Sequence, residues 1–135
     1  MRHIIVATHG EMAKGIVHTA EFIMGKQECL HALAAYTQEC LDFPRELKRL
    51  VEDLSKEGEV VVLTDLLGGS VNNEALSLLP SNKVHIITGV NLALVIQLLG
   101  GGADIQKSID GAREAIMYCN AAIDEGVQET ELDEF

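Results

Sequence analysis

Four short apolar runs alternate with segments of helical period along this chain, and this alternation limits the fold more than any other feature. Each run is dominated by Ile, Val, Leu and Ala, as in strands buried on both faces of a parallel sheet. Parallel strands joined through helices have right-handed crossovers, which place helices on both faces. We therefore predict an α/β fold, a doubly wound and mostly parallel sheet with strand order 2-1-3-4. The four runs are His3–Thr8, Cys29–Ala35, Val60–Leu63 and Lys83–Thr88.

The segments between the runs carry apolar residues three or four positions apart and end at residues that cap or break helices. Asp42 is suited to cap the second helix, Pro44 stands in its first turn, and Gly58 ends it. Ser70 and Ser108 are the predicted caps of the third helix and of the last one. The predicted helices are 12–25, 43–58, 70–79, 91–99 and 109–123, the last of them a single element.

The length of 135 residues fits one domain with one core. We predict that residues 1–123 form this domain and that residues 124–135 form an acidic tail. The formal net charge is −11, and about half of it comes from the acidic residues of this tail. Such a charge argues against nucleic acid or an anionic membrane surface as a partner, because both are bound by clustered Lys and Arg.

Cysteine spacing and hydropathy give no sign of a metal site, a disulfide framework or a membrane span. Cys29, Cys40 and Cys119 form no C-x-x-C pair, and no His, Cys, Asp or Glu pair falls at metal-ligand spacing. We predict neither a metal nor another cofactor. The longest apolar run, Val90–Leu99, is too short to cross a bilayer, and no charged-then-apolar leader precedes the first strand. These features predict a cytoplasmic protein with free thiols.

Polar residues stand at the ends of the first and third predicted strands. His9 and Gly10 follow the first strand, and Asp65 with the segment Leu66–Ser70 follows the third. In an open α/β sheet, ligands bind beyond the carboxyl ends of the strands, where the strand order reverses. With strands one and three adjacent, His9 and Asp65 face the same crevice.

A histidine paired with a carboxylate is suited to carry a phosphoryl group. The carboxylate accepts a hydrogen bond from one ring nitrogen and leaves the lone pair of the other nitrogen free to attack phosphorus. We therefore predict His9 and Asp65 as the catalytic pair. Singly, a histidine at a strand end is often a polar cap and a Gly-Gly-Ser segment is often a turn, so the prediction rests on their combination. The predicted phosphoryl-binding residues are Gly10, Leu67, Gly68, Gly69 and Ser70. The imidazoles without a predicted role are His3, His18, His31 and His85.

These segments resemble the EIIA domains of the mannose class (mannose, fructose and sorbose) of the bacterial phosphoenolpyruvate-dependent sugar phosphotransferase system. The resemblance covers nearly the whole chain and lies in three strand-end segments, Val6–Gly10, Asp65–Ser70 and Gly89–Leu92. It implies that residues 1–123 are a phosphocarrier domain that accepts a phosphoryl group from phospho-HPr on His9 and passes it to an EIIB partner. It further implies a homodimer in which a C-terminal strand, here within residues 126–135, joins the sheet of the partner subunit.

Two departures from the family pattern leave the transported sugar open. Val71 stands where the family often has Pro after the Gly-Gly-Ser segment, and Ala93 stands at the place of a second frequent Pro. Neither departure removes a group that takes part in the chemistry.

Two other functions fit parts of the sequence. Thr8-His9-Gly10-Glu11 is similar to the Arg-His-Gly-Glu signature of histidine phosphatases, although Thr8 stands where the phosphate-clamping Arg should be. A receiver domain is disfavoured, because no acidic pair follows the first strand. The second alternative is a regulatory module whose phosphorylation state is read by a transcription regulator or a kinase.

Overall fold

The parallel sheet predicted from the four apolar runs is confirmed. The computed structural model describes residues 1–80, 84–102 and 104–124, and in these ranges four parallel strands form one sheet in the order β2-β1-β3-β4. Lys83, which was expected to open the fourth strand, lies outside the described residues. The strands are β1 (Arg2–His9), β2 (Leu30–Ala35), β3 (Glu59–Thr64) and β4 (Val84–Thr88).

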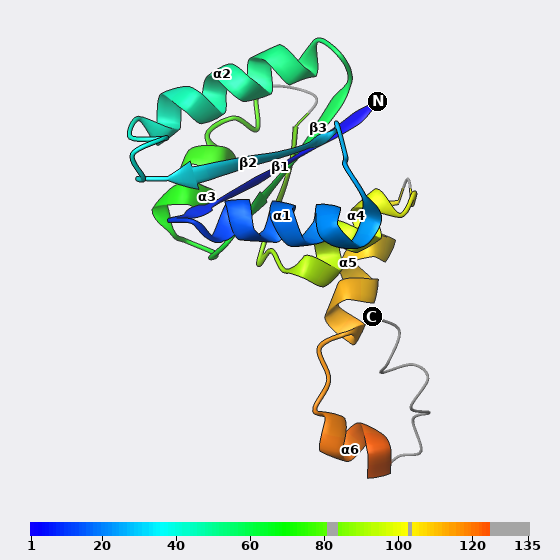
Figure 1. The fold of residues 1–135 in the computed structure, drawn as a ribbon. Helices are drawn as coiled ribbons and strands as arrows, with labels where there is room; N and C mark the ends of the chain where they lie inside the picture. The colour runs from blue at the N-terminus through cyan, green and yellow to red at the C-terminus, as the bar shows by residue number, and fades with distance from the viewer. Residues whose placement is uncertain (81–83, 103, 125–135) are drawn as a thin grey trace.

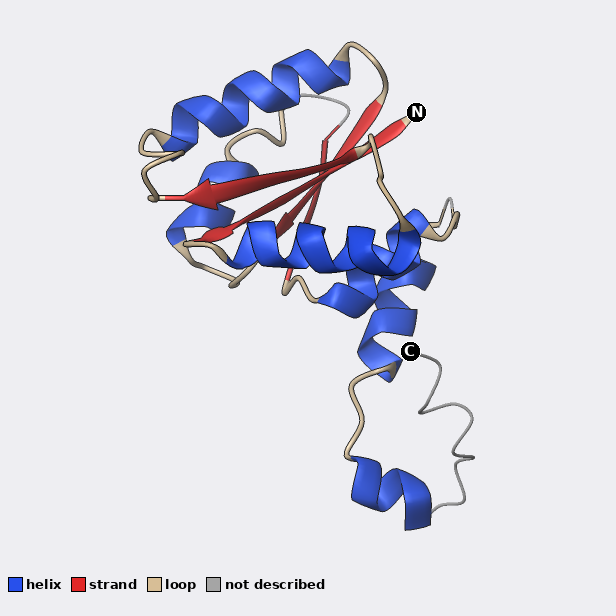
Figure 2. Cartoon of the chain, in the orientation of Figure 1, coloured by secondary structure: helices blue, strands red, loops and turns tan. Residues whose placement is uncertain are grey.

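Helices cover both faces of the sheet, because successive strand residues point to opposite sides. Ile4 and Val6 of β1 pack with buried residues of α1, α4 and α5, whereas Ile5 and Ala7 pack with α2 and α3. Figure 1 shows the two helical layers, and Figure 2 shows the sheet between them. No helix of the described ranges is both long and apolar enough to cross a membrane. The helices are α1 (Met12–Met24), α2 (Phe43–Ser55), α3 (Ser70–Leu76), α4 (Leu92–Leu99), α5 (Ile105–Glu114) and α6 (Cys119–Asp124).

Two of the predicted caps have different outcomes. Asp42 caps α2 as expected, since its side chain accepts a hydrogen bond from the backbone N–H of Arg45 (3.4 Å). Ser70 does not cap α3: Gly69 takes the N-cap position in an extended conformation, and Ser70 is the first helical residue. The hydroxyl of Ser70 instead contacts the ring of His9 at the carboxyl edge of the sheet (3.2 Å). The helix also ends at Leu76 instead of Leu79.

The predicted start of the last helix, at Ile109, is wrong. Asp104 caps α5 by accepting a hydrogen bond from the backbone N–H of Lys107 (3.2 Å), so the helix begins at Ile105. Ser108, the expected cap, is buried inside the helix. An aspartate is as good a cap as a serine, and here it lies one turn earlier.

The length of this helix is also wrong, because α5 ends at Glu114 and a separate helix, α6, follows. Figure 1 shows α6 lying beyond the layer that α1 and α4 form. Ala112 is buried against that layer, whereas Ile116 and Ile123 are 74% and 57% exposed. The apolar residues of the predicted 109–123 helix thus fall into two groups, one that packs within the chain and one that stays on the surface.

Two imidazoles contact each other across β1 and β2, at the opposite end of these strands from His9. His3 Nδ1 lies 3.2 Å from His31 Nε2, and Glu57 Oε2 lies 3.6 Å from the other ring nitrogen of His3. One of the two contacting nitrogens must act as the acceptor, so the contact excludes protonation of both rings. Burial lowers the pKa of His31, the neighbouring His3 lowers it further, and Glu57 opposes them.

Acidification from about pH 7.5 to about pH 5 is expected to destabilise the fold partly through His31. The pKa of His31 in the folded chain lies below its ordinary value of 6.5, so the unfolded chain binds the proton more readily. Stability is therefore lost as the pH falls through that value. The urea midpoint should fall less in His31→Gln than in the wild type, while the exposed control His18→Gln should follow the wild type. Equal falls in the wild type and His31→Gln contradict this account.

Candidate functional site

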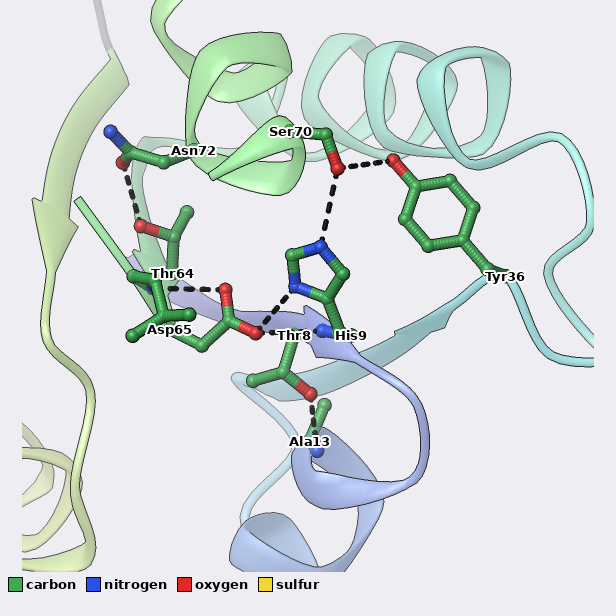
Figure 3. A network of polar contacts seen from close by, with 9 residues as sticks. Thr8, His9, Ala13, Tyr36, Thr64, Asp65, Ser70 and Asn72 are labelled. Atoms are coloured by element: carbon green, nitrogen blue, oxygen red, sulfur yellow. Dashed lines mark hydrogen bonds and ion pairs between the residues drawn. The ribbon is translucent and has the colours of Figure 1, made fainter. Parts of the chain in front are cut away.

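His9 and Asp65 meet at the carboxyl edge of the sheet, as their positions after adjacent strands predicted. His9 is the last residue of β1, and Asp65 directly follows β3. His9 Nδ1 lies 2.8 Å from Asp65 Oδ2, and the backbone N–H of His9 donates to the same oxygen (2.8 Å). Figure 3 shows the carboxylate on one side of the imidazole and the hydroxyl of Ser70 on the other.

The environment of the Asp65 carboxylate keeps it ionised. Its side chain is only 10% exposed, compared with 44% for His9. Burial raises the pKa of Asp65, but hydrogen bonds from the backbone N–H and the ring of His9 and from the backbone N–H of Leu66 outweigh it, so the net pKa is lowered. An ionised carboxylate is only an acceptor. Neutral His9 therefore carries its proton on Nδ1 and presents a lone pair on Nε2.

Ser70 faces the second ring nitrogen. Its Oγ lies 3.2 Å from His9 Nε2, and because Nε2 is an acceptor, the hydroxyl is the donor in this contact. Gly69 has little room beside it, because a Cβ added there would lie 3.3 Å from the carbonyl oxygen of Leu66, closer than an ordinary contact. The same Cβ would lie 3.5 Å from His9 Cε1, within ordinary van der Waals distance.

The other predicted phosphoryl-binding residues lie on the two loops that follow β1 and β3. The N–H of Gly10 donates to the carbonyl oxygen of Ala35 (3.0 Å), and that of Gly69 donates to Leu66 (3.1 Å). These two glycines therefore shape the backbone with N–H groups that already have partners. Gly68 adopts a positive φ of 79° with open space beside it, and Leu67 is 82% exposed.

Two buried threonines fix the strand ends that carry His9 and Asp65. Thr8 Oγ1 accepts a hydrogen bond from the backbone N–H of Ala13 (2.8 Å) and so joins β1 to the first turn of α1. Thr64 donates its hydroxyl to Asn72 Oδ1 (2.7 Å), which joins β3 to α3. All three polar side chains are at most 2% exposed. Each satisfied buried hydrogen bond contributes about 0.5–1.5 kcal/mol and restricts where His9 and Asp65 can stand.

Tyr36 is a site residue that the sequence reasoning missed. It follows the carboxyl end of β2, the strand next to β1, and its hydroxyl lies 2.9 Å from Ser70 Oγ. Its ring centroid lies 5.6 Å from that of His9. The predicted strand order 2-1-3-4 could have indicated Tyr36 as a site residue, because it places the end of β2 beside His9.

The site is an open surface. Hollows of about 350 Å³ between α2 and α3 and of about 340 Å³ between β4 and α5 both lie away from His9. Within the described residues, no three His, Cys, Asp or Glu side chains are grouped so as to hold a metal ion. The half-exposed His9 ring on such a surface is accessible to a group presented by another protein.

Comparisons with known proteins agree on one family. A family model described as the fructose IIA component of the phosphotransferase system (EIIA-man) matches residues 3–117. The fructose-specific EIIA component of Bacillus subtilis (strain 168) is 26% identical over 101 residues, which cover 73% of this chain and 69% of the relative.

Two crystal structures extend this similarity to the fold. One, from Klebsiella pneumoniae subsp. pneumoniae MGH 78578, is described as a permease of the phosphoenolpyruvate-dependent sugar phosphotransferase system. It is 38% identical with a TM-score of 0.83, over 90% of this chain and 93% of that one. The other is the IIA protein associated with the fucose utilization operon of Streptococcus pneumoniae. It is 30% identical with a TM-score of 0.82, over 90% of this chain and 96% of that one.

Proposed function

The chain belongs to the EIIA-man family of the sugar phosphotransferase system, and we propose that it carries the phosphoryl group on His9. Members of this family are phosphocarriers in sugar phosphotransfer. The observation that supports His9 as the carrier is its contact with Asp65, which leaves Nε2 as the nucleophilic nitrogen at an open edge of the sheet.

The proposed transfer needs no group beyond those at this edge. The Nε2 lone pair of His9 attacks phosphorus, the bond between phosphorus and the donor nitrogen breaks, and its electron pair returns to the donor imidazole. The imidazole of His9 becomes more positive during the attack, and the Asp65 carboxylate stabilises that charge through Nδ1–H. The reverse sequence passes the group to the next carrier.

Ser70 is the proposed hydroxyl donor to the phosphoryl group. Before transfer its hydroxyl donates to Nε2 (3.2 Å), and a phosphoryl group on Nε2 would occupy that direction. The hydroxyl then turns to a phosphoryl oxygen. The proposed phosphoryl-binding segment around this position consists of the loop residues Gly10, Leu67, Gly68 and Gly69.

The role of Thr8 supports a carrier over a histidine phosphatase. A phosphatase of that type needs an arginine before the histidine to clamp the phosphate. Here Thr8 is fully buried, and its hydroxyl is occupied by the backbone of Ala13. The residue thus serves the fold and does not reach the site.

The partners proposed are phospho-HPr as the donor and an EIIB protein as the acceptor, with the cytoplasm as the compartment. The test is phosphotransfer from phosphoenolpyruvate through the general enzyme of the system and HPr to the purified chain. An acid-labile, base-stable adduct on His9 is expected, and mass spectrometry after digestion locates it. An adduct confined to another residue contradicts the proposal.

We also expect the chain to be a homodimer. In the described part of the chain, β4 has a neighbouring strand on one side only. The end of β4 and helix α5 border the hollow of about 340 Å³, which Ile87, Ile109 and Ile116 help to line. Such an apolar groove beside an edge strand is suited to receive a strand from another subunit. The candidate strand, within residues 126–135, lies outside the described residues.

Light scattering tests the dimer. The expected mass is twice the chain mass of 14.6 kDa. Ile116→Asp should shift the protein toward the monomer, because a carboxylate would be buried in the apolar groove. Leu41→Asp is the control, since Leu41 is also exposed (69%) but lies outside that groove. A wild-type monomer at micromolar concentration contradicts the dimer and leaves the role of His9 untouched.

A further inference from the structure

The backbone of Tyr36 adopts a conformation that a tyrosine ordinarily avoids. Its φ is 67°, and in the ranges that the structure describes it is the only residue other than glycine with a positive φ. The left-handed region is unfavourable for a side chain of this size, and such residues concentrate at functional sites. The side chain is also 49% exposed, so burial does not explain its position.

The surrounding turn holds Tyr36 in this conformation. The N–H of Tyr36 donates to the carbonyl oxygen of Cys40 (3.0 Å), and the N–H of Cys40 donates to that of Thr37 (3.0 Å). The Thr37 hydroxyl donates to the carbonyl oxygen of Ala34 (2.8 Å), which links the turn to β2. The fully buried ring of Phe43 packs edge-on against the tyrosine ring, with centroids 6.0 Å apart at 61°. These contacts direct the Tyr36 side chain across the end of β2 toward the site, as Figure 3 shows.

The hydrogen bonds at the site form a series in which Tyr36 is the first donor. Asp65 is an acceptor, so His9 Nδ1–H donates to it and Nε2 accepts from Ser70. Ser70 has a single proton, which is committed to Nε2. The hydroxyl of Tyr36, 2.9 Å from Ser70 Oγ, is therefore the donor in that contact. The resulting order is Tyr36 to Ser70 to His9 to Asp65.

We propose that Tyr36 is a positioning residue for phosphoryl transfer that acts through Ser70, an inference that rests on the proposed function. Because Tyr36 donates to Ser70 Oγ, the serine hydroxyl does not donate to Tyr36. Its single proton is therefore available to donate first to His9 Nε2 and then to a phosphoryl oxygen. It also restricts rotation of the Ser70 side chain, so the donor is already in place when the group arrives. Hydrogen bonds that donate in series strengthen one another.

The test uses phosphoramidate, a small phosphoryl donor that needs no protein partner. The rate of adduct formation on His9 is compared in the wild type, Tyr36→Phe, Ser70→Ala and the double variant. Tyr36→Phe keeps the ring and its contact with Phe43, so the fold should persist, and thermal melting checks this. Tyr118→Phe is the matched control, because Tyr118 is exposed (74%) and lies beyond α5.

We expect Tyr36→Phe to react about fivefold more slowly and Ser70→Ala about tenfold more slowly, in line with the loss of one hydrogen bond near a charged group. The double variant should match Ser70→Ala, because the hydroxyl of Tyr36 has no effect without the serine. The ¹⁵N shift of His9 Nε2 in the unphosphorylated protein should move in Tyr36→Phe toward its value in Ser70→Ala. Tyr118→Phe should behave as the wild type.

The outcomes separate this inference from the function on which it rests. A wild type that forms an adduct on His9 at the same rate as Tyr36→Phe overturns the role of Tyr36 and leaves the phosphocarrier role standing. Rate losses that multiply in the double variant also overturn it, because Tyr36 would then act independently of Ser70. A wild type that forms no adduct on His9 counts against the proposed function, and the ¹⁵N shift still reports whether Tyr36 acts on Ser70.

Discussion

Replacing His9 with alanine is expected to reduce phosphoryl uptake to less than about a hundredth of the wild-type value, because the proposed nucleophile at the carboxyl edge is lost. The other imidazoles stand elsewhere. His3 and His31 contact each other at the opposite end of their strands, and His85 contacts Glu59 at the start of β3 (3.0 Å). His18 lies on the exposed surface of α1, outside the network of Asp65 and Ser70.

The measurement is incorporation of labelled phosphate from phosphoenolpyruvate through the general enzyme and HPr. His9→Ala should keep its fold, because the His9 side chain is 44% exposed; circular dichroism and the melting temperature verify this. His18→Ala is the control and should label normally. Labelling of His9→Ala at a wild-type rate on a different histidine would remove His9 from its proposed role.

The fold and the contact between His9 and Asp65 were predictable for the same physical reason. Apolar runs such as Val60–Leu63 have no stable place except inside a sheet covered on both faces. Once the strands are parallel, their carboxyl ends share one edge. The contact between His9 and Asp65, 56 positions apart, then follows from the strand order and needs no knowledge of loop conformation.

The features that were missed depend on contacts that a linear pattern does not contain. Tyr36 reaches Ser70 only because its backbone is held at a positive φ by the turn that follows β2. Helical spacing continues through Ile116 and Ile123, yet α5 ends at Glu114 and both isoleucines are exposed. Serine favours the N-cap position, which makes Ser70 the expected cap of α3, but here Gly69 occupies that position.

Asp65→Asn is expected to slow phosphorylation of His9 by about 10²- to 10³-fold, an effect of the size seen when one electrostatic partner of a reacting group is removed. The amide has nearly the shape of the carboxylate but lacks its charge, so it stabilises the imidazole less as positive charge develops. It also carries N–H donors. If one of them donates to Nδ1, the ring proton moves to Nε2 and the nucleophilic lone pair is lost from the exposed side.

Comparison of Asp65→Asn with Asp65→Ala separates these two causes. If the amide imposes the wrong tautomer, the asparagine variant should be slower than the alanine variant, and the ¹⁵N shifts of His9 should show the proton on Nε2. If loss of charge dominates, the two variants should be equally slow with the proton distributed over both nitrogens. Wild-type rates in both variants would leave the carboxylate without a catalytic role.

Because hydrogen bonds hold the pKa of Asp65 below its ordinary value of 3.8, the carboxylate contributes stability at neutral pH that is lost as the pH falls through the folded-state pKa. Both variants should therefore lose less stability than the wild type on acidification below about pH 4.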